Sequence, residues 1–393
     1  MTSFIRITGR DPLVARDGRP FGAGQGNRMR SVGWLYPSVV AGSLRTAIVK
    51  EVQKPFDSTT TTQLLQMDIA GVFPVAVDEL YVPAPNDCVL KPDGTACRAR
   101  PEKPRDGEGG DWPTDGLWPV MLSEAVAKDD FKPTEGPAYW PLSRYTDWLV
   151  GKTITPTGPD YLAAPLAETR DHVSIKAMAG AAEEGLLFTT VGVSVAALPK
   201  HGTSLDDPVA LAGPRRLDKF TQLELVARVE NAPGWAQPTL QALSMWHSLG
   251  GERRLAHWRA ANDAHVWDCP TDVLAALSNA KQVTMRLVTP AVFADGWKPG
   301  WLNEQLIGTP PSGGPTLKLV GVCIQRWRAV SGWSYVANGP KAVRRVVPAG
   351  GVYFFEVESG SAESLGRAGW LRSVSDPEQD RRDGFGLAIW GLW

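Results

Sequence analysis

Residues 38–52, SVVAGSLRTAIVKEV, form the clearest helical pattern in the chain. Val40, Leu44 and Ile48 recur at the spacing of one helix face, so they predict an amphipathic helix with a single apolar stripe. Ser38 is a residue type that commonly caps a helix, and we expect the helix to begin there. The position of this helix guides the interpretation of the segments on either side of it.

The segments around this helix are β-rich. Residues 4–8 precede it and residues 72–77 follow it, and both have the composition of strands. A strand, a helix and a further strand joined to antiparallel hairpins suggest ferredoxin-like α+β units. Further strands are expected at residues 186–198, 220–229, 283–293, 317–327 and 352–358.

Three stretches lack an apolar period and are expected to be loops. The longest, residues 91–116, is acidic and is expected to be a mobile surface insertion. The other two are residues 199–216 and 308–315. We place an amino-terminal domain with the acidic insertion at residues 1–200, and a carboxyl-terminal domain that ends in a glycine-rich loop at residues 201–393.

Composition limits the class of protein. No run approaches the ~18 consecutive apolar residues of a membrane helix, and the first ten residues lack the features of a signal peptide, so a soluble cytoplasmic protein without membrane contact is expected. The four cysteines form no C-x-x-C motif, which argues against a zinc site or a disulfide framework.

The charge distribution is uneven. The formal net charge of −1 argues against a free-standing nucleic-acid binder, which is usually basic as a whole. Residues 1–50 nevertheless carry eight basic and two acidic side chains, whereas residues 51–140 carry eight basic and sixteen acidic ones. This asymmetry is compatible with one basic face for a polyanion and an acidic surface elsewhere.

Enzyme signatures are missing. The sequence Gly151-Lys152-Thr153 resembles the end of a phosphate loop, but Thr146 stands where the loop requires glycine. The chain has no G-x-S-x-G or H-E-x-x-H motif, and its five histidines include no i, i+4 pair. We therefore expect no catalytic residue, no metal and no cofactor.

Several short motifs, taken in order along the whole chain, resemble one family. The matching motifs are DPL at 11–13, RDGRPF at 16–21, PSVVAGSLRT at 37–46, EGLLF at 184–188, LGGERR at 249–254, TPA at 289–291, GWKP at 296–299, VPAGGVY at 347–353 and GFG at 384–386. In these motifs the chain resembles the third subunit of the Cmr module, a RAMP-superfamily protein of type III-B CRISPR effector complexes. The acidic loop at residues 91–116 matches nothing shared by the family.

The resemblance implies two ferredoxin-like (RRM-like) RAMP domains and a non-catalytic role in antiviral defence. Such a subunit holds the 5′ repeat-derived tag of the CRISPR RNA. Its expected partners are that RNA, the large polymerase-like subunit and the backbone RAMP subunits of the effector complex.

The candidate RNA-binding residues are mainly arginines and glycines. A helix that begins at Ser38 would present free backbone N–H groups to a phosphate, and a tight turn before Arg253 could aim a guanidinium at RNA. The resemblance implies that the carboxyl-terminal glycine-rich loop contacts the RNA backbone. The full set is Arg16, Arg19, Ser38, Gly42, Arg45, Arg253, Arg254, Arg344, Arg345, Arg381, Arg382, Gly384 and Gly386.

Each of these candidates also has a structural interpretation. The serine could only cap its helix, the arginines could form structural ion pairs, and the glycines could only allow a tight hairpin. Four tryptophans, Trp297, Trp301, Trp327 and Trp333, could stack on bases or could belong to the core. Two alternative functions stay open: a CRISPR-RNA processing endoribonuclease, and a protein-protein interaction module that does not contact RNA.

Overall fold

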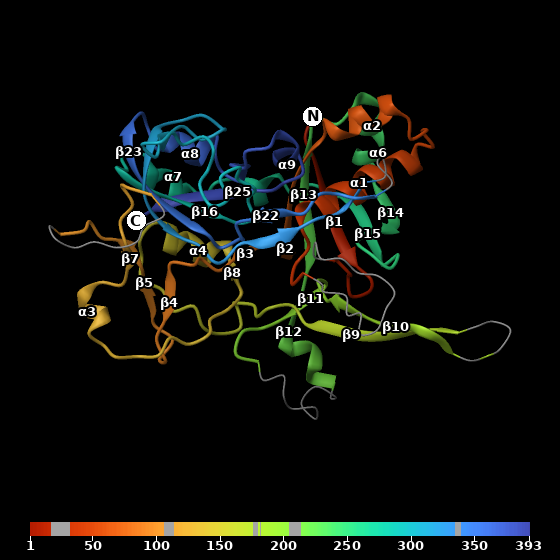
Figure 1. Ribbon diagram of the computed structural model, residues 1–393, viewed down its shortest axis with the longest axis horizontal. Coiled ribbons are helices and arrows are strands. Elements are labelled where there is room, and N and C mark those ends of the chain that lie inside the picture. Colours follow the sequence, from red (N-terminus) through yellow and green to blue (C-terminus); the bar gives the residue numbers. More distant parts are fainter. Residues whose placement is uncertain (17–31, 106–113, 176–179, 181, 204–213, 335–338) are drawn as a thin grey trace.

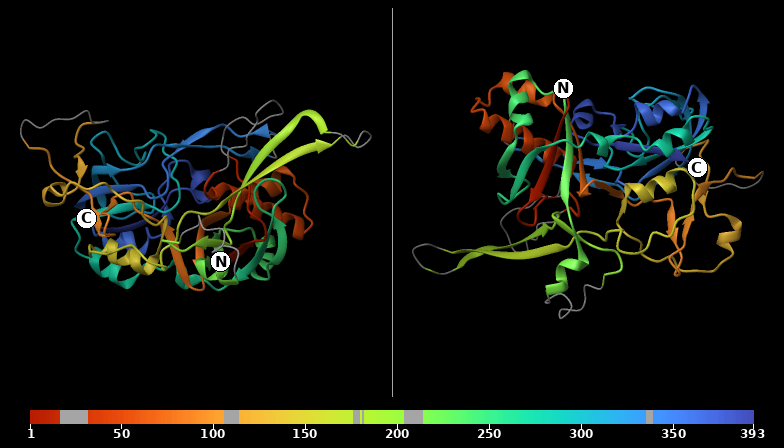
Figure 2. Two further views of the ribbon diagram at one scale, coloured as in Figure 1. Left: turned by 90° about the horizontal axis from the view of Figure 1, so that it is seen from below. Right: turned by 180° about the vertical axis from the view of Figure 1, so that it is seen from behind.

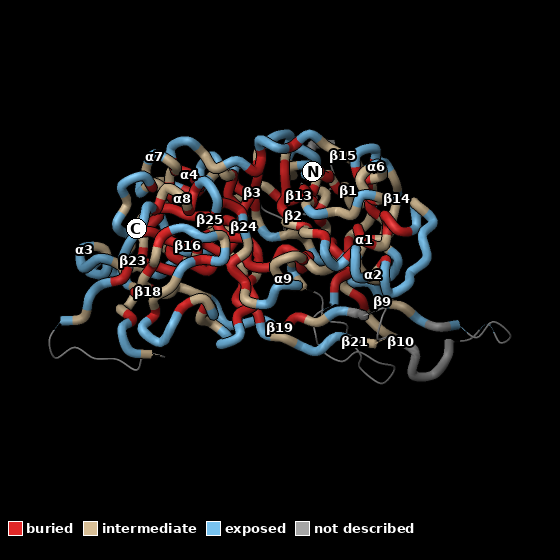
Figure 3. The backbone as a smooth tube through the Cα atoms, turned by 90° about the horizontal axis from the view of Figure 1, so that it is seen from above, coloured by how far each residue is buried: buried red, intermediate tan, exposed pale blue. Residues whose placement is uncertain are grey.

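Two antiparallel sheets lie side by side in the computed structural model (Figure 1). Helices α1, α2 and α6 cover the first sheet at one end of the molecule, and helices α4, α7 and α8 lie at the other end (Figures 1 and 3). The structure describes residues 1–16, 32–105, 114–175, 180, 182–203, 214–334 and 339–393. Within these residues, no helix is long and apolar enough to cross a membrane.

The first sheet has seven strands in the order β14-β15-β1-β13-β2-β3-β8. Their bounds, in that order, are Ser244–Ser248, Leu255–Ala261, Ser3–Gly9, Glu224–Glu230, Asp68–Ala76, Glu79–Pro83 and Tyr139–Pro141. The second sheet has six strands in the order β17-β18-β23-β16-β25-β24. Their bounds are Ile307–Gly308, Thr316–Cys323, Val352–Ser359, Gln282–Leu287, Leu387–Leu392 and Arg372–Ser373.

Shorter elements surround the two sheets. Strand pairs outside the sheets are β4 (Cys88–Leu90) with β5 (Ala96–Arg98), β6 (Arg100–Pro101) with β7 (Val120–Met121), β9 (Ala167–Ile175) with β10 (Ala182–Val193), β11 (Ala197–Pro199) with β12 (Phe220–Gln222), β19 (Arg328–Val330) with β22 (Arg344–Val346), and β20 (Trp333–Ser334) with β21 (Gly339–Pro340). The α-helices are α1 (Pro37–Glu51), α2 (Ser58–Leu65), α3 (Glu124–Ala127), α4 (Leu142–Leu149), α6 (Gln237–Gln241), α7 (Thr271–Leu277), α8 (Glu363–Arg367) and α9 (Glu378–Arg382). The 3-10 turns are Pro214–Lys219, Gly234–Ala236 and Ala264–Trp267.

The two sheets repeat one strand arrangement. In the first, β1, β2, β13 and β15 follow one another along the chain and lie in the order β15-β1-β13-β2. In the second, β16, β18, β23 and β25 lie in the order β25-β16-β23-β18, which is the same arrangement. Helices α1 and α6 connect strands of the first sheet, and α8 connects β23 to β25 in the second. The predicted α+β class is confirmed.

The segment after residue 201 does not open the second sheet. Strands β13, β14 and β15 all follow that residue, and β13 and β15 pair directly with β1 in the first sheet. The second sheet begins only at β16. The long insertion between β2 and β13 carries the hairpin β9–β10, which extends away from both sheets (Figures 1 and 2).

Helix α1 begins one residue earlier than its sequence pattern predicts. Its N-cap is Tyr36 and Pro37 occupies its first turn, so Ser38 is not the cap. Proline is well suited to that position because the missing N–H has no partner within the helix. The predicted apolar stripe is confirmed: Leu44 and Ile48 are fully buried and pack in one cluster with Ile5 of β1.

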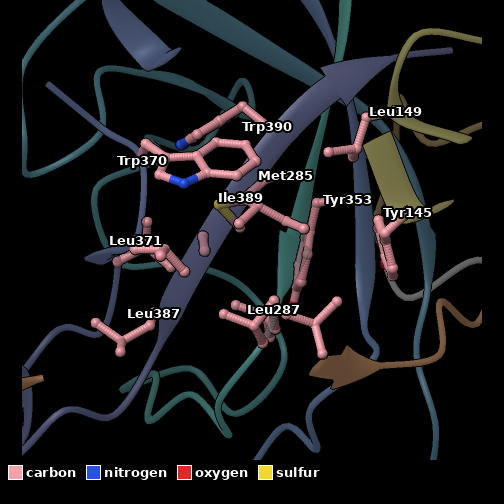
Figure 4. Close-up of a cluster of buried hydrophobic side chains, with 14 of the residues drawn as sticks. Tyr145, Leu149, Met285, Leu287, Tyr353, Trp370, Leu371, Leu387, Ile389 and Trp390 are labelled. Carbon is pink, nitrogen blue, oxygen red and sulfur yellow. The ribbon is translucent and has the colours of Figure 1, made fainter. Parts of the chain in front are cut away.

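A second apolar cluster lies under the other sheet. Met285 of β16 and Ile389 and Trp390 of β25 are fully buried and pack with Tyr353 of β23 (Figure 4). Leu149 of α4 belongs to the same cluster. The buried residues follow the strands of both sheets, as Figure 3 shows, and the connections around them are largely exposed.

The prediction of a plain surface loop at residues 91–116 is wrong for its first part. Ala96 and Cys97 in β5 and Ala99 are buried, and Pro101 in β6 packs against Gly321 of β18. Small apolar residues between the charges therefore seat this segment on the second sheet. Residues 106–113 lie outside the described residues.

Candidate nucleic-acid interface

Among the described residues, a concentration of exposed positive charge lies on strands β19 and β22 and the segments that flank them. Residues 325–346 contain five basic and no acidic side chains. The strands pair antiparallel, with Ala329 opposite Arg345. We call the described residues 326–334 and 339–345 the basic hairpin; its cations are Arg326, Arg328, Lys341, Arg344 and Arg345.

The two neighbouring arginines of β22 serve different purposes. Arg344 pairs with Asp380 and lies 5.8 Å from the ring centroid of Phe385. Arg345 is exposed, and its guanidinium lies 4.6 Å from the ring centroid of Trp327. The predicted alternation of a strand is therefore present, and Arg345 is the one of the two that faces solvent.

Four cations of the basic hairpin are exposed and have no carboxylate partner among the described residues: Arg326, Arg328, Lys341 and Arg345. Trp327 lies between two of them with 45% of its surface exposed. An arginine stacked on an exposed indole presents both a flat ring and a fixed charge. This combination suits the bases and phosphates of a single strand.

The start of α1 is joined to the basic hairpin. The Tyr36 hydroxyl donates a hydrogen bond to the carbonyl of Ala329 at 3.1 Å. Tyr36 also packs in a small apolar cluster with Val330, Val346 and Phe385. Because these contacts are buried, the helix start and the basic hairpin hold a fixed relation to each other.

The start of α1 has no side-chain cap among the described residues. The side chain of its N-cap, Tyr36, makes no capping hydrogen bond to the helix, and the first turn contains no acidic residue. Ser38 is half-buried in that turn, and Gly42 is exposed with no atom within 4 Å of the position a Cβ would take. No carboxylate of the helix's own first turn therefore compensates the positive end of its dipole.

A cavity of about 260 Å³ opens beside the basic hairpin and the start of α1. Arg328 and Gln325 line one side of it, and Trp34, Tyr36 and Tyr139 line another. Trp34 and Tyr139 lie with ring centroids 5.2 Å apart. The cavity wall is therefore largely apolar and includes aromatic rings, with one cation and one amide on it.

Arg16 and the predicted turn at residues 249–254 lie close to each other. Val14 pairs with Gly251, and the Val14 carbonyl accepts a hydrogen bond from the Gly251 amide at 2.6 Å. Arg16 and Arg253 are both exposed. These two exposed arginines therefore belong to segments that lie next to each other.

The turn has the strained backbone that its sequence predicts. Gly250 has a φ of +79°, and a Cβ there would lie 2.5 Å from the Val14 carbonyl oxygen. Arg253 also has a positive φ, of +51°. Arg254 is half-buried, and its Nε has no hydrogen-bond partner among the described residues. Arg19 lies outside the described residues.

Arg45 occupies a buried position inside the fold. Its Nη1 donates to Asp383 Oδ1 at 2.5 Å and its Nη2 donates to the Met67 carbonyl at 2.8 Å. A guanidinium that is buried and bonded on both sides joins parts of the protein and does not face RNA. The structure therefore favours the structural interpretation of Arg45.

The carboxyl-terminal glycine-rich segment is also packed inside the protein. Gly384 has a φ of +89°, and a Cβ there would lie 2.6 Å from the Ile69 carbonyl oxygen in β2. Gly386 has a φ of +71°, and a Cβ there would lie 2.3 Å from Ser375 Oγ. The close backbone approach that both glycines permit is to other protein segments.

The arginines before these glycines bond to protein atoms. Arg381 donates from Nη1 to the carbonyl of Ser375 at 3.0 Å and to that of Asp376. Arg382 bonds to Gln66 and to Glu378. Together with Arg45, this segment fastens α9 to the first sheet, so a structural interpretation is favoured here too.

Of the four tryptophans named from the sequence, Trp327 is exposed. Trp301 stacks on Phe355 with centroids 5.6 Å apart, and Trp297 packs against the core, where its carbonyl accepts a bond from Tyr353. Trp333 lies in β20.

Sequence reasoning missed Arg326, Arg328 and Lys341. The signal that could have identified them is the lack of any acidic residue between positions 325 and 346, in a chain whose basic and acidic residues are nearly equal in number. A local charge count over windows of about twenty residues detects this segment. A count over fifty residues or more lowers the charge excess per residue, so the segment no longer stands out.

Comparison with protein families places the chain among the CRISPR-associated proteins. The family model described as CRISPR-associated protein (Cas_Cmr3) matches residues 5–393, and the chain belongs to this family. The resemblance drawn from the sequence motifs is thereby confirmed.

Solved structures with similar folds come from type III CRISPR complexes. One chain of a Type III-B Cmr-beta complex bound to cognate target RNA is 12% identical, with a TM-score of 0.47, over 89% of this chain and 86% of that chain. One chain of a Csm3-Csm4 subcomplex of the type III-A interference complex is 7% identical, with a TM-score of 0.41, over 100% of this chain and 99% of that chain. A comparison with curated proteins gave no match.

Proposed function

We propose that this protein is a non-catalytic RNA-binding scaffold subunit of a type III-B CRISPR ribonucleoprotein, and that it holds the 5′ repeat-derived tag of the CRISPR RNA. The observation that carries the proposal is the basic hairpin, with its exposed arginines, beside an apolar cavity that contains aromatic rings and beside the start of α1, which no described side chain caps. Single-stranded RNA is bound by this combination of backbone contacts and stacking surfaces.

The RNA-binding surface in this proposal differs from the first list of candidates. Its centre is formed by Arg326, Arg328, Lys341 and Arg345, with Ser38 and Gly42 at the start of α1. Arg16, Arg253 and Arg254 form an outer part that extends the path of the RNA; Arg19 stays a candidate from the sequence and lies outside the described residues. The remaining candidates, Arg45, Arg344, Arg381, Arg382, Gly384 and Gly386, support the shape of the surface from within.

Two ferredoxin-like units complete the proposal. The repeated strand arrangement of the two sheets supports them, since a strand order of 4-1-3-2 is that of a ferredoxin-like unit. Because β13 to β15 pair within the first sheet, we place the boundary between residues 261 and 282, not at residue 200. The RNA-binding surface then lies where the two units meet.

The family resemblance also supports docking of this subunit to the large polymerase-like subunit and to backbone RAMP subunits. A stable pair of this kind buries at least roughly 1,000 Å². Co-purification of the two chains at micromolar concentration tests this, and separate elution contradicts it.

A processing endoribonuclease fits the site less well. RNA cleavage without a metal needs a general base, and no histidine lines the cavity beside the basic hairpin. Incubating the purified protein with full repeat RNA separates the two functions. Specific metal-independent cleavage supports the nuclease, whereas intact RNA supports the scaffold.

The salt dependence of RNA binding tests the proposed surface. In the assembled complex, replacing Arg328 and Arg345 together by serine removes two exposed cations without disturbing a buried bond. Each lost phosphate contact lowers the slope of log affinity against log salt by about 0.7. We therefore expect a fall of roughly 1 to 1.5 in the slope and a weaker affinity for the guide RNA.

The matched control removes two exposed arginines elsewhere. Arg144 and Arg367 have side chains 56% and 68% exposed and lie outside the proposed surface. Their replacement by serine changes the net charge equally and leaves the slope as in the wild type. Equal slopes in both double variants overturn the proposed surface. The isolated chain, with a net charge of −1, is expected to bind RNA weakly.

A further inference from the structure

The cavity beside the basic hairpin has a wall suited to a flat ring. Trp34 is only half-buried there, and Tyr139 holds it from behind, with the two ring planes inclined at 50°. Tyr139 is buried and Trp140, the next residue, is fixed in the core. The indole of Trp34 and the ring of Tyr139 therefore lie against each other on the wall of the cavity, and Trp34 keeps part of its surface exposed there.

The polar groups of the cavity stand at its mouth. Gln325 and Arg328 are both exposed and both line the cavity. The Gln325 amide has one bond, from Nε2 to Asn86 Oδ1 at 3.3 Å, so its carbonyl oxygen is available to accept. Arg328 has no carboxylate partner among the described residues.

The size of the cavity limits its occupant. Pockets for drug-sized ligands measure about 300–1,000 Å³, and this one, at about 260 Å³, lies just below that range. A cavity of this size has room for a small planar group such as one nucleobase, with the chain that carries it left outside.

We propose that this cavity receives one unstacked base of single-stranded RNA, with the base against Trp34, its polar edge at Gln325 and an adjacent phosphate at Arg328. The inference rests on the proposed RNA-binding function and adds the part of the RNA that enters the protein. Sequence-specific RNA recognition commonly targets bases that are splayed out and stacked on aromatic side chains. Binding of one such base fixes the register of the strand on the protein.

A thermodynamic cycle between RNA and protein tests the inference. Guide RNAs with one abasic nucleotide, moved stepwise along the 5′ tag, are bound to the reconstituted complex containing either the wild-type chain or Trp34→Ala. Removing one stacked base typically weakens binding about tenfold. With the wild-type chain we expect this loss of affinity at one position of the tag. With Trp34→Ala we expect that an abasic nucleotide at the same position no longer lowers the affinity.

Two other variants keep the test independent of any folding defect. Gln325→Ala changes an exposed side chain, and we expect it to reduce the loss at the same abasic position. Trp34→Phe retains an aromatic ring and is expected to retain most of the affinity. Trp246→Ala serves as the control. It removes a tryptophan of β14 that is 57% exposed and does not line the cavity.

The outcomes separate this inference from the function on which it rests. If no abasic position weakens wild-type binding, or if the loss persists unchanged in both Trp34→Ala and Gln325→Ala, the base pocket is wrong. If the double variant at Arg328 and Arg345 binds guide RNA with the wild-type affinity and salt slope, the RNA surface itself is wrong. A loss at one position that disappears in the Trp34 and Gln325 variants supports the pocket.

Discussion

Arg45 in α1 and Asp383 directly after α9 form a buried ion pair, with Nη1 and Oδ1 2.5 Å apart and side chains 8% and 7% exposed. They are 338 residues apart in sequence. The pair joins the first long helix to the segment that enters the last strand of the second sheet. Arg45, which belongs to the basic first fifty residues, thus links the first sheet to the second.

Removing one member of this pair is expected to destabilise the protein. Arg45→Met leaves Asp383 buried without its charge partner, which typically costs about 3–5 kcal/mol of unfolding free energy. Chemical denaturation of the isolated chain measures this loss. Arg367→Met, which breaks an exposed pair with Glu363, serves as the control and is expected to cost less than about 1 kcal/mol. Equal losses in the two variants contradict the assignment.

Gly386 is expected to be intolerant of alanine. Its φ of +71° disfavours a side chain, and a Cβ would meet Ser375 Oγ at 2.3 Å and the Ser375 amide nitrogen at 2.8 Å. Gly386→Ala is therefore expected to lower the melting temperature or prevent folding. Gly42→Ala is the matched control, since that position in α1 is open and alanine favours a helix by about 0.5–1 kcal/mol. A melting temperature of Gly386→Ala at or above that of the wild type contradicts the packing described here.

Local patterns were sufficient to predict helix α1 and several strands of the two sheets, but not strands β14 and β15 of the first sheet. The apolar stripe of α1 and the strands β1, β2, β18 and β23 are each encoded within about fifteen consecutive residues. Pairing of β13 and β15 with β1 joins segments more than two hundred residues apart, so no local pattern placed the unit boundary.

Prediction of the site residues also succeeded where the signal was local and failed where it depended on distant segments. An arginine reads as a surface cation in sequence, and whether Arg45 is buried depends on an aspartate near the other end of the chain. For Arg344 and Arg345, strand alternation predicted that only one could face a given partner, and Asp380 determines which one. The basic hairpin could have been found locally, because its charge excess lies within one short segment.

The arginines at the end of α9 are expected to contribute to stability more than to RNA binding. Replacing Arg381 and Arg382 together by serine removes the bonds to the carbonyls of Ser375 and Asp376 and to Gln66. Hydrogen bonds from charged groups typically contribute about 1.5–3 kcal/mol each when partly buried. We expect a lower melting temperature with an unchanged salt slope of RNA binding in the assembled complex. An unchanged melting temperature together with a reduced salt slope of RNA binding would show that these arginines contact RNA.

Protease digestion should distinguish the two parts of the acidic insertion. Residues 96–101 are held in β5 and β6 with buried side chains, so cleavage there is expected only after unfolding. Limited proteolysis followed by mass spectrometry of the fragments measures this. Early cleavage between residues 96 and 101, in a chain that otherwise stays folded, contradicts the seating of this segment on β18.

The stability of the protein is expected to fall as the pH is lowered from 7.5 to 5.5. Burial lowers the pKa of His247 in β14 below its usual 6.5, the charge of Lys50 lowers it further, and a bond to the Ser248 carbonyl opposes the shift only in part. Burial lowers the pKa of His201 as well.

Between the folded and unfolded pKa values the unfolded chain binds more protons, so the unfolding free energy rises with pH in this window. The stabilisation is therefore present above pH 6.5 and is lost as the pH falls through the lower, folded pKa values. Melting temperatures at half-unit steps test this, with His247→Gln expected to show a shallower decline and His247→Gln with His201→Gln a shallower one still. Curves for the wild type and both variants that run parallel from pH 7.5 to 5.5 show that neither histidine contributes.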